Sequence, residues 1–445
     1  MKPIRLLILL LILVAAIAAA MPPAVARLAS APQPAAQPTG RPMPTAPPAT
    51  RVATAPPSTT PATPQPTPHS PTALLPFQCG AWFFSGANVP WQNGGYGADF
   101  ATVEEWGQHT YSPVDTAATY ADLTAAGAHT ARWWLFTDGR GAPEFDALAG
   151  GQVTSLDADF LPSLASAISL AAQHDVYLVL TLWDFSMLFA DSDVNGRGEH
   201  AGYHGNLITH AADRQGFIDN ALLPMLMYPV DGYTIGTHPN VLAWEIINEP
   251  EWVITELGAV DGRVVQPVSL AQMQRFVAEL AAVIHQHSSQ LVTVGSASLK
   301  WNSDTVPGAY GNIWDDADLA PFAAAGTLDF YQVHYYGWMN GDEVNWSYSP
   351  VFNTFAAAGL DKPTVVGEFP ANGLDVGIAL PALLEAIYAN GYAGAWTWSY
   401  EGVDGHGSWA DSVAALAAFN QAHAAETAVA NLCGQLSFLP LISHR

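Results

Sequence analysis

Eight times along the chain, a short run of β-forming residues is followed by a longer run rich in Ala and Leu. This alternation predicts an α/β fold, a (β/α)8 TIM barrel of parallel strands in one domain. The predicted strands are residues 77–85, 129–136, 176–183, 241–248, 291–296, 328–335, 363–368 and 392–399. The predicted helices include residues 115–126, 156–174, 270–287, 351–358, 379–390 and 410–424.

A doubly wound open sheet is the alternative architecture, because it also alternates strands and helices. Several of the predicted strands are almost entirely apolar, as expected where helices cover the outside of a sheet and its inside is also buried. No Gly-rich phosphate loop follows the first predicted strand. The pattern therefore favours the closed barrel.

The two ends of the chain are predicted to lie outside the barrel. Residues 1–26 have a basic start, an apolar run at 6–20 and an Ala-Val-Ala cleavage signal at 24–26, which is typical of a signal peptide. Residues 27–74 are dominated by Pro, Ala and Thr and are predicted to form a disordered linker. Residues 75–434 form the predicted catalytic domain, and residues 435–445 a short apolar tail. We expect a secreted protein, with tethering to the cell surface as the alternative.

The charge balance restricts the partners that the protein can bind. The chain has 39 acidic and 14 basic residues, a formal net charge of −25. Such a surface repels nucleic acids and anionic membranes, so we expect neither as a partner. A neutral polysaccharide or oligosaccharide remains compatible, and we expect a monomer. The 15 Trp residues suit stacking on sugars, although a large core would also use them.

The chain has two cysteines, Cys79 and Cys433, one near each end of the predicted barrel. An exported protein can oxidise such a pair. Because a barrel brings its ends together, we predict a Cys79–Cys433 disulfide, with two separate buried thiols as the alternative.

Polar and aromatic residues gather at the C-terminal ends of the predicted strands or just beyond them. In TIM barrels this end carries the active site. The residues concerned are Arg132, Asp184, Asn248, Glu249, Trp301, His334, Tyr336, Glu368 and Trp398.

Two of these residues are glutamates at the ends of the fourth and seventh strands, in Trp-Glu-Ile-Ile-Asn-Glu-Pro (244–250) and Val-Gly-Glu-Phe-Pro (366–370). Hydrolysis of a glycosidic bond requires two carboxyl groups, one that protonates the leaving oxygen and one that attacks or activates water. With both motifs at these strands, the chain resembles glycoside hydrolase family 5, a family of retaining clan A barrels that includes β-mannanases and cellulases. The resemblance covers residues 77–420.

The resemblance implies a role for each residue of the motifs. Glu249 is the implied acid/base and Glu368 the implied nucleophile, with their carboxyl groups about 5–5.5 Å apart. Asn248 is implied to bind the sugar 2-hydroxyl, and Arg132 to keep Glu368 ionised. No cofactor or metal is implied.

Further residues are implied to contact the substrate. Tyr336 is implied to lie against the nucleophile, His334 near the acid/base, and Trp398 beneath the reacting sugar. Three residues also have a structural alternative: Arg132 could neutralise Glu245, His334 could be a core histidine, and Trp398 could only pack. Glu245 points inward and is predicted to pair with Arg132, whereas we interpret Glu251 and Glu401 as bystanders or polar groups of subsites.

The substrate is less closely defined by the motifs. Residues 130–139 are similar to the second-strand region of β-mannanases, which favours β-mannan over cellulose or β-glucan. Asp184 stands where relatives often carry His or Asn, which leaves the subfamily open. Trp133, Trp183, Trp252, Trp301 and Trp338 are candidate stacking platforms. The rival hypotheses are an exo-acting β-glycosidase and a non-catalytic carbohydrate-binding barrel, although the latter would be expected to lose one glutamate.

Residues 191–199 resemble a calcium loop in the spacing of their oxygen ligands. Gly202 occupies the position of the bidentate Glu, so a polar loop is favoured over a calcium site. His200, His204 and His210 lack strong metal spacing, and we interpret them as subsite or surface residues.

Overall fold

The computed structural model describes residues 73–103, 109–146, 151–189, 203–337, 347–374 and 377–429. The predicted signal peptide, almost all of the linker and the tail lie outside these ranges, as do the loop at 191–199, His200, Trp338 and Cys433. Cys79 is disulfide-bonded.

Eight parallel strands form a closed barrel, as predicted. They are β3 (Phe84–Asn88), β4 (Thr130–Thr137), β7 (Tyr177–Asp184), β10 (Val241–Asn248), β11 (Leu291–Ser296), β12 (Tyr331–His334), β13 (Thr364–Pro370) and β14 (Gly394–Trp398). Pairing of β14 with β3, in which Gly394 lies opposite Phe84, closes the barrel. Closure excludes the doubly wound open sheet.

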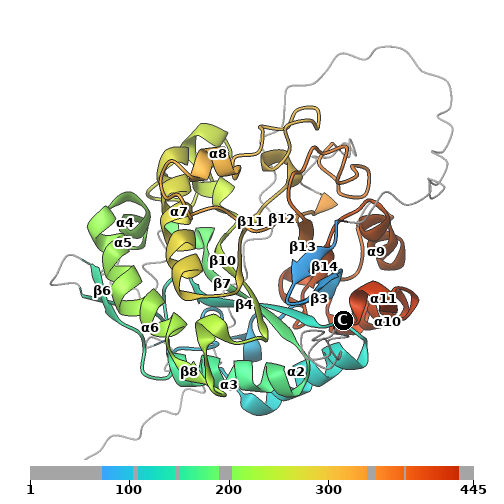
Figure 1. Cartoon of the computed structure of the whole chain (residues 1–445), viewed down its shortest axis with the longest axis horizontal. Coiled ribbons are helices and arrows are strands. Elements are labelled where there is room, and N and C mark those ends of the chain that lie inside the picture. The colour runs from blue at the N-terminus through green and yellow to red at the C-terminus, as the bar shows by residue number, and fades with distance from the viewer. Residues whose placement is uncertain are drawn as a thin grey trace, which may run out of the picture. The chain divides into compact units, whose positions relative to one another are not determined.

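Helices surround the strands (Figure 1). They are α2 (Pro113–Ala125), α3 (Phe160–Gln173), α4 (Tyr203–Thr209), α5 (Ala211–Phe217), α6 (Leu223–Leu226), α7 (Leu270–His287), α8 (Asp316–Leu319), α9 (Leu380–Ala389), α10 (Trp409–Ala422) and α11 (Ala424–Thr427). The longest, α7, begins at a capping box in which Ser269 and Gln272 satisfy each other's backbone N–H groups. Among the described residues, no helix combines the length and the apolar character that crossing a membrane requires.

The first barrel strand begins later than the sequence predicts. Residues 75–82 form a hairpin of β1 (Leu75–Phe77) and β2 (Gly80–Trp82), and the barrel strand starts at Phe84. Leu75 and Trp82 of the hairpin are buried against residues at the N-terminal ends of the barrel strands, among them Phe84 and Tyr177. The hairpin therefore covers the end of the barrel opposite the predicted active site.

The predicted helix at 351–358 is wrong, because the segment forms turns. Asn390 donates hydrogen bonds from its side chain to the carbonyl oxygens of Pro350 and Val351, at 2.8 and 2.7 Å. Thr354 caps the backbone N–H of Ala357 at 3.0 Å. Side chains that bond the backbone in this way compete with helical hydrogen bonds.

Two further short hairpins complete the described strands. The hairpin of β5 (Glu144–Asp146) and β6 (Gln152–Ser155) follows β4, and the hairpin of β8 (Pro229–Val230) and β9 (Tyr233–Thr234) follows α6. These hairpins lie outside the barrel sheet.

We predict that Gly86→Ala destabilises the barrel. A Cβ atom at Gly86 would lie 2.0 Å from the carbonyl oxygen of Thr130 on the neighbouring strand, and this backbone atom cannot move without disturbing the β3–β4 pairing. Overpacking of this kind costs about 1–3 kcal/mol, which thermal unfolding should detect as a lower Tm. Gly262→Ala is the control, because no atom lies within 4 Å of its Cβ position. Equal Tm values for the two variants would contradict the prediction.

Candidate active site

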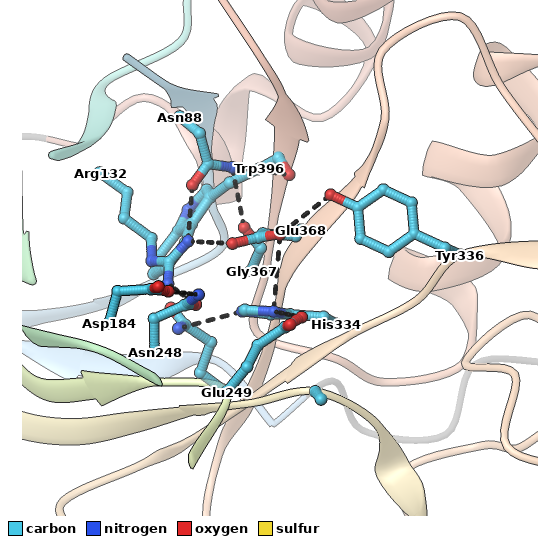
Figure 2. A network of polar contacts seen from close by, with 12 residues as sticks. Asn88, Arg132, Asp184, Asn248, Glu249, His334, Tyr336, Gly367, Glu368 and Trp396 are labelled. Carbon is cyan, nitrogen blue, oxygen red and sulfur yellow. Dashed lines mark hydrogen bonds and ion pairs between the residues drawn. The ribbon is translucent and has the colours of Figure 1, made fainter. Parts of the chain in front are cut away.

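The polar residues of the candidate site lie at or near the C-terminal ends of β3, β4, β7, β10, β12 and β13. Figure 2 shows Arg132, Tyr336 and His334 converging on Glu368 from different sides, with Glu249 beside His334. A separate group of buried aromatic residues lies at the same end of the barrel: Trp91, Trp134, Tyr336 and Trp398. The structure therefore brings the predicted polar residues together next to aromatic surface.

Arg132 on β4 is fully buried and lies at the centre of the polar network. Its Nε and Nη2 atoms each donate to one oxygen of Glu245, both at 2.6 Å. Nη1 donates to Glu368 Oε1 at 2.6 Å. Burial lowers the pKa of Arg132, but Glu245 and Glu368 outweigh burial and raise it. Arg132 thus contacts both carboxylates, which the sequence had presented as alternatives.

Glu368 on β13 accepts a hydrogen bond at each oxygen. Arg132 binds Oε1, and the Tyr336 hydroxyl donates to Oε2 at 2.9 Å. Burial raises the pKa of Glu368 above its ordinary value, although His334 and Arg132 oppose the shift. The guanidinium therefore stabilises the ionised form of this carboxylate inside the protein.

Glu249 follows β10 and has a left-handed backbone, with φ 46° and ψ 47°. Its Oε2 accepts the indole N–H of Trp252 at 2.8 Å. Its Oε1 contacts His334 Nδ1 at 2.8 Å. Burial raises the pKa of Glu249 to about 7, although the Trp252 hydrogen bond opposes the shift. No Lys or Arg of the described ranges forms an ion pair with Glu249, so this carboxyl keeps its proton to a higher pH than an exposed glutamate.

His334 on β12 lies between the two glutamates. Burial lowers the pKa of His334 to about 4, so the ring is neutral at ordinary pH. Its Nε2 faces the amide nitrogen of Gln332 at 3.5 Å. This contact fits the tautomer in which Nε2 accepts and Nδ1–H donates to Glu249.

One oxygen of Glu249, one oxygen of Glu368 and a ring nitrogen of His334 lie within 4.8 Å of one another. Such a group could in principle bind a metal ion. Glu368, however, already accepts an N–H of Arg132, and Glu249 accepts the indole N–H of Trp252. The guanidinium of Arg132 would also repel a cation. The arrangement fits a pair of reacting carboxyl groups better than a metal site.

Asn248 has a fixed amide orientation. Its Oδ1 accepts from Arg132 Nη2 at 2.7 Å, and its Nδ2 donates to Asp184 Oδ2 at 2.7 Å. The second oxygen of Asp184 accepts the backbone N–H of Ser186 at 2.9 Å. One N–H of Asn248 therefore remains for a ligand, while both Asp184 oxygens already have donors.

Two of the proposed stacking residues belong to the core. Trp183 has 0% exposure and packs against Phe136 and Phe217, with ring centroids 5.1 and 5.5 Å away. Trp133 is 1% exposed and donates to Asp99 at 2.6 Å. The prediction that Trp183 binds substrate is therefore wrong, as is that for Trp133, because neither ring offers a face to a sugar.

The other aromatic candidates lie nearer the glutamates. Trp252 is half-buried, and its ring meets that of Trp301 edge-on at 5.5 Å. Trp301 itself is only 2% exposed, so Trp252 presents more surface in this pair. Trp398 packs edge-on against Trp134 at 5.3 Å. His204, interpreted as a subsite or surface residue, is instead buried against Phe145.

Sequence reasoning missed several residues of the network. Asn88 at the end of β3 accepts from Arg132 Nη1 at 2.8 Å, and Trp134 stacks on the guanidinium at 4.1 Å. Gln332 donates to Glu245 at 2.9 Å. The predicted first strand ends at residue 85, three residues before Asn88, so the pattern leaves Asn88 outside the strand. With β3 at its true position, Asn88 would have appeared at the active end of the barrel.

No protein-family model matches the chain. The mannan endo-1,4-beta-mannosidase of Mytilus edulis is 31% identical over 338 residues, which cover 71% of this chain and 83% of the mussel protein. The chain belongs to the β-mannanase family of glycoside hydrolase family 5. A second β-mannanase, from Cryptopygus antarcticus, is 28% identical over 339 residues, covering 72% of this chain and 80% of that protein.

Solved β-mannanase structures agree with this assignment. The enzyme from Mytilus edulis superposes with a TM-score of 0.64 at 27% identity and covers 79% of this chain and 97% of its own. The enzyme from Eisenia fetida gives a TM-score of 0.65 at 26% identity, covering 78% and 94%. The resemblance to glycoside hydrolase family 5 is thereby confirmed, and within it the β-mannanases.

We predict that Glu245→Ala strongly destabilises the protein. The substitution leaves Arg132 buried without its bidentate partner. Breaking a buried ion pair in this way costs about 3–5 kcal/mol, which urea unfolding followed by Trp fluorescence can measure. Glu385→Ala is the control, because its ion pair with His423 is exposed and should contribute less than about 1 kcal/mol. The prediction fails if both variants lose the same stability.

Proposed function

We propose that this protein is an exported retaining endo-β-1,4-mannanase, which hydrolyses β-1,4-mannan by double displacement. The observation that carries the proposal is the close approach of Glu249 and Glu368, whose nearest oxygens lie within 4.8 Å. Retaining glycosidases hold their two carboxyl groups about 5–5.5 Å apart, and inverting enzymes about 6.5–9.5 Å apart. The short separation supports retention, because it leaves no room for a water between the sugar and the second carboxylate.

The electrostatic environments support a different role for each glutamate. Arg132 contacts Glu368 directly and favours its ionised form, which suits a nucleophile. Burial keeps Glu249 protonated to about pH 7, which suits a general acid. The two glutamates therefore have the same chemistry in water but different neighbours in this site: Glu368 contacts a guanidinium that favours its ionised form, whereas Glu249 contacts Trp252 and His334.

The reaction then proceeds in two steps. A Glu368 oxygen bonds to the anomeric carbon while the bond to the leaving oxygen breaks, and Glu249 transfers its proton to that oxygen. In the second step Glu249 takes a proton from water, whose oxygen displaces Glu368 and restores the original configuration. The free N–H of Asn248 binds the 2-hydroxyl, and Trp398 supports the reacting sugar.

The identity of the substrate rests on the relatives. The Mytilus edulis and Cryptopygus antarcticus proteins are both named mannan endo-1,4-beta-mannosidase, which supports internal cleavage of β-mannan over the exo-acting alternative. The retention of both glutamates argues against a non-catalytic binding barrel. Export is supported by the predicted signal peptide, and the linker would give the catalytic domain reach toward an insoluble polymer.

The first test is reducing-sugar release from β-mannan, β-glucan, cellulose and xylan by the wild-type protein and by Glu368→Ala. We expect activity on β-mannan above the other polymers, and a loss of more than about 1000-fold in the variant, which lacks the nucleophile. Unfolding curves should show that the variant remains folded. Activity that survives in Glu368→Ala would refute the mechanism. A wild-type protein that releases no reducing sugar from β-mannan would refute the proposed substrate.

The second test is the pH dependence of kcat/KM on a soluble mannooligosaccharide. Because burial raises the pKa of Glu249 to about 7, the protonated acid persists up to that pH and is lost above it, so kcat/KM should fall as pH rises through about 7. Trp252→Phe removes a hydrogen bond that lowers this pKa, so the alkaline limb should move to higher pH. A limb that stays in place would contradict the assignment of Glu249.

A further inference from the structure

Glu251 is a buried carboxylate that the proposed reaction does not use. It lies in the short 3-10 helix η7 (Pro250–Val253), two residues after Glu249, and is 0% exposed. Its Oε2 accepts the backbone N–H of Ala297 at 3.0 Å, and its Oε1 accepts the indole N–H of Trp314 at 3.2 Å. Glu251, interpreted from the sequence as a bystander or a polar group of a subsite, is therefore a buried residue with both carboxylate oxygens bonded.

The bonds of Glu251 lie beside a strained backbone. A left-handed conformation like that of Glu249 is strained for a residue other than glycine, and persists only where the surroundings hold it. The Glu249 N–H donates to the carbonyl oxygen of Gly295 at 2.6 Å. The second bond joins the residues two positions after these: the backbone N–H of Ala297 donates to the carboxylate of Glu251. Two bonds thus join the turn of the acid/base to the end of β11.

The same turn carries Trp252, whose indole N–H binds Glu249. The ring of Trp252 meets the ring of Trp301, which belongs to the loop after β11. In the same loop, the carbonyl oxygen of Trp301 accepts the backbone N–H of Ile313 at 3.1 Å. Trp314, the next residue, donates to Glu251. Glu251 therefore links the turn of the acid/base to two points of the loop after β11.

We propose that Glu251 is a positioning residue for the acid/base: its carboxylate fixes the turn so that Glu249 and Trp252 keep the geometry that proton transfer requires. The proposal rests on the proposed function. It predicts that loss of Glu251 impairs the proton transfers of the reaction more than the attack by Glu368.

Substrates that differ in their leaving group separate these two effects. A sugar leaving group departs only when Glu249 protonates its oxygen. A 2,4-dinitrophenolate leaves as a stable anion and needs no proton, so its release depends on Glu368 alone. In the second step azide can attack the glycosyl-enzyme without giving up a proton, whereas water must transfer one to Glu249.

The experiment compares kcat/KM for a mannooligosaccharide with kcat/KM for 2,4-dinitrophenyl β-mannobioside. We expect Glu251→Ala to lose at least about 10-fold more on the oligosaccharide, because general acid catalysis contributes about 100- to 10,000-fold. Azide should raise kcat of Glu251→Ala on the dinitrophenyl substrate. Glu251→Gln retains one acceptor and should show a smaller change in the same direction.

Glu256→Gln is the matched control. Glu256 lies in the neighbouring segment and also accepts a backbone N–H, that of Leu270 at 3.0 Å, but it is exposed and does not bind the turn of Glu249. For Glu256→Gln, the ratio of kcat/KM on the oligosaccharide to kcat/KM on the dinitrophenyl substrate should equal the wild-type ratio.

Because both rates come from one preparation, their ratio does not depend on the folded fraction. Equal losses on the two substrates, without rescue by azide, would overturn the positioning role. If Glu251→Ala does not fold, the ratio for Glu251→Gln decides, and a wild-type ratio would overturn the proposal. A wild-type protein that turns over neither substrate would instead refute the proposed function.

Discussion

The buried guanidinium of Arg132 is the interaction on which the active end of the barrel depends. Its five N–H groups meet Glu245 twice and Asn88, Asn248 and Glu368 once each. These partners come from β3, β10 and β13, so one planar group on β4 sets the positions of three other strands. A buried charge without partners is costly, and the network therefore ties the stability of the fold to the geometry of the site.

The two glutamates have the same side chain but differ in their surroundings, which suit them to different chemical roles. Glu368 contacts the guanidinium, which favours its carboxylate form. Glu249 contacts His334 instead of the guanidinium, and burial raises its pKa. His334 is itself kept neutral by burial, so it can donate to Glu249 without adding a second positive charge to the site.

The loops after β10 and β11 complete the site. Glu249 has a left-handed backbone, and its turn is bonded to Gly295 and Ala297. The same turn supplies Trp252, which serves both as a hydrogen-bond donor to the acid/base and as exposed aromatic surface beside it. Polar and aromatic residues of the site therefore depend on one short segment of chain.

The local sequence pattern determined the barrel, the bounds of β10 and β11, and the pairing of Glu249 with Glu368. Strand–helix alternation and short motifs depend only on residues that are close together in the chain. Only the tertiary structure decided that residues 75–82 turn back as a hairpin and that Asn88 joins Arg132. It also decided that Trp183 faces the core and that Glu251 ties two loops together. These outcomes depend on neighbouring strands, on register shifts such as the one between Glu245 and Asn248, and on contacts between segments distant in the chain, none of which a local pattern of residues contains.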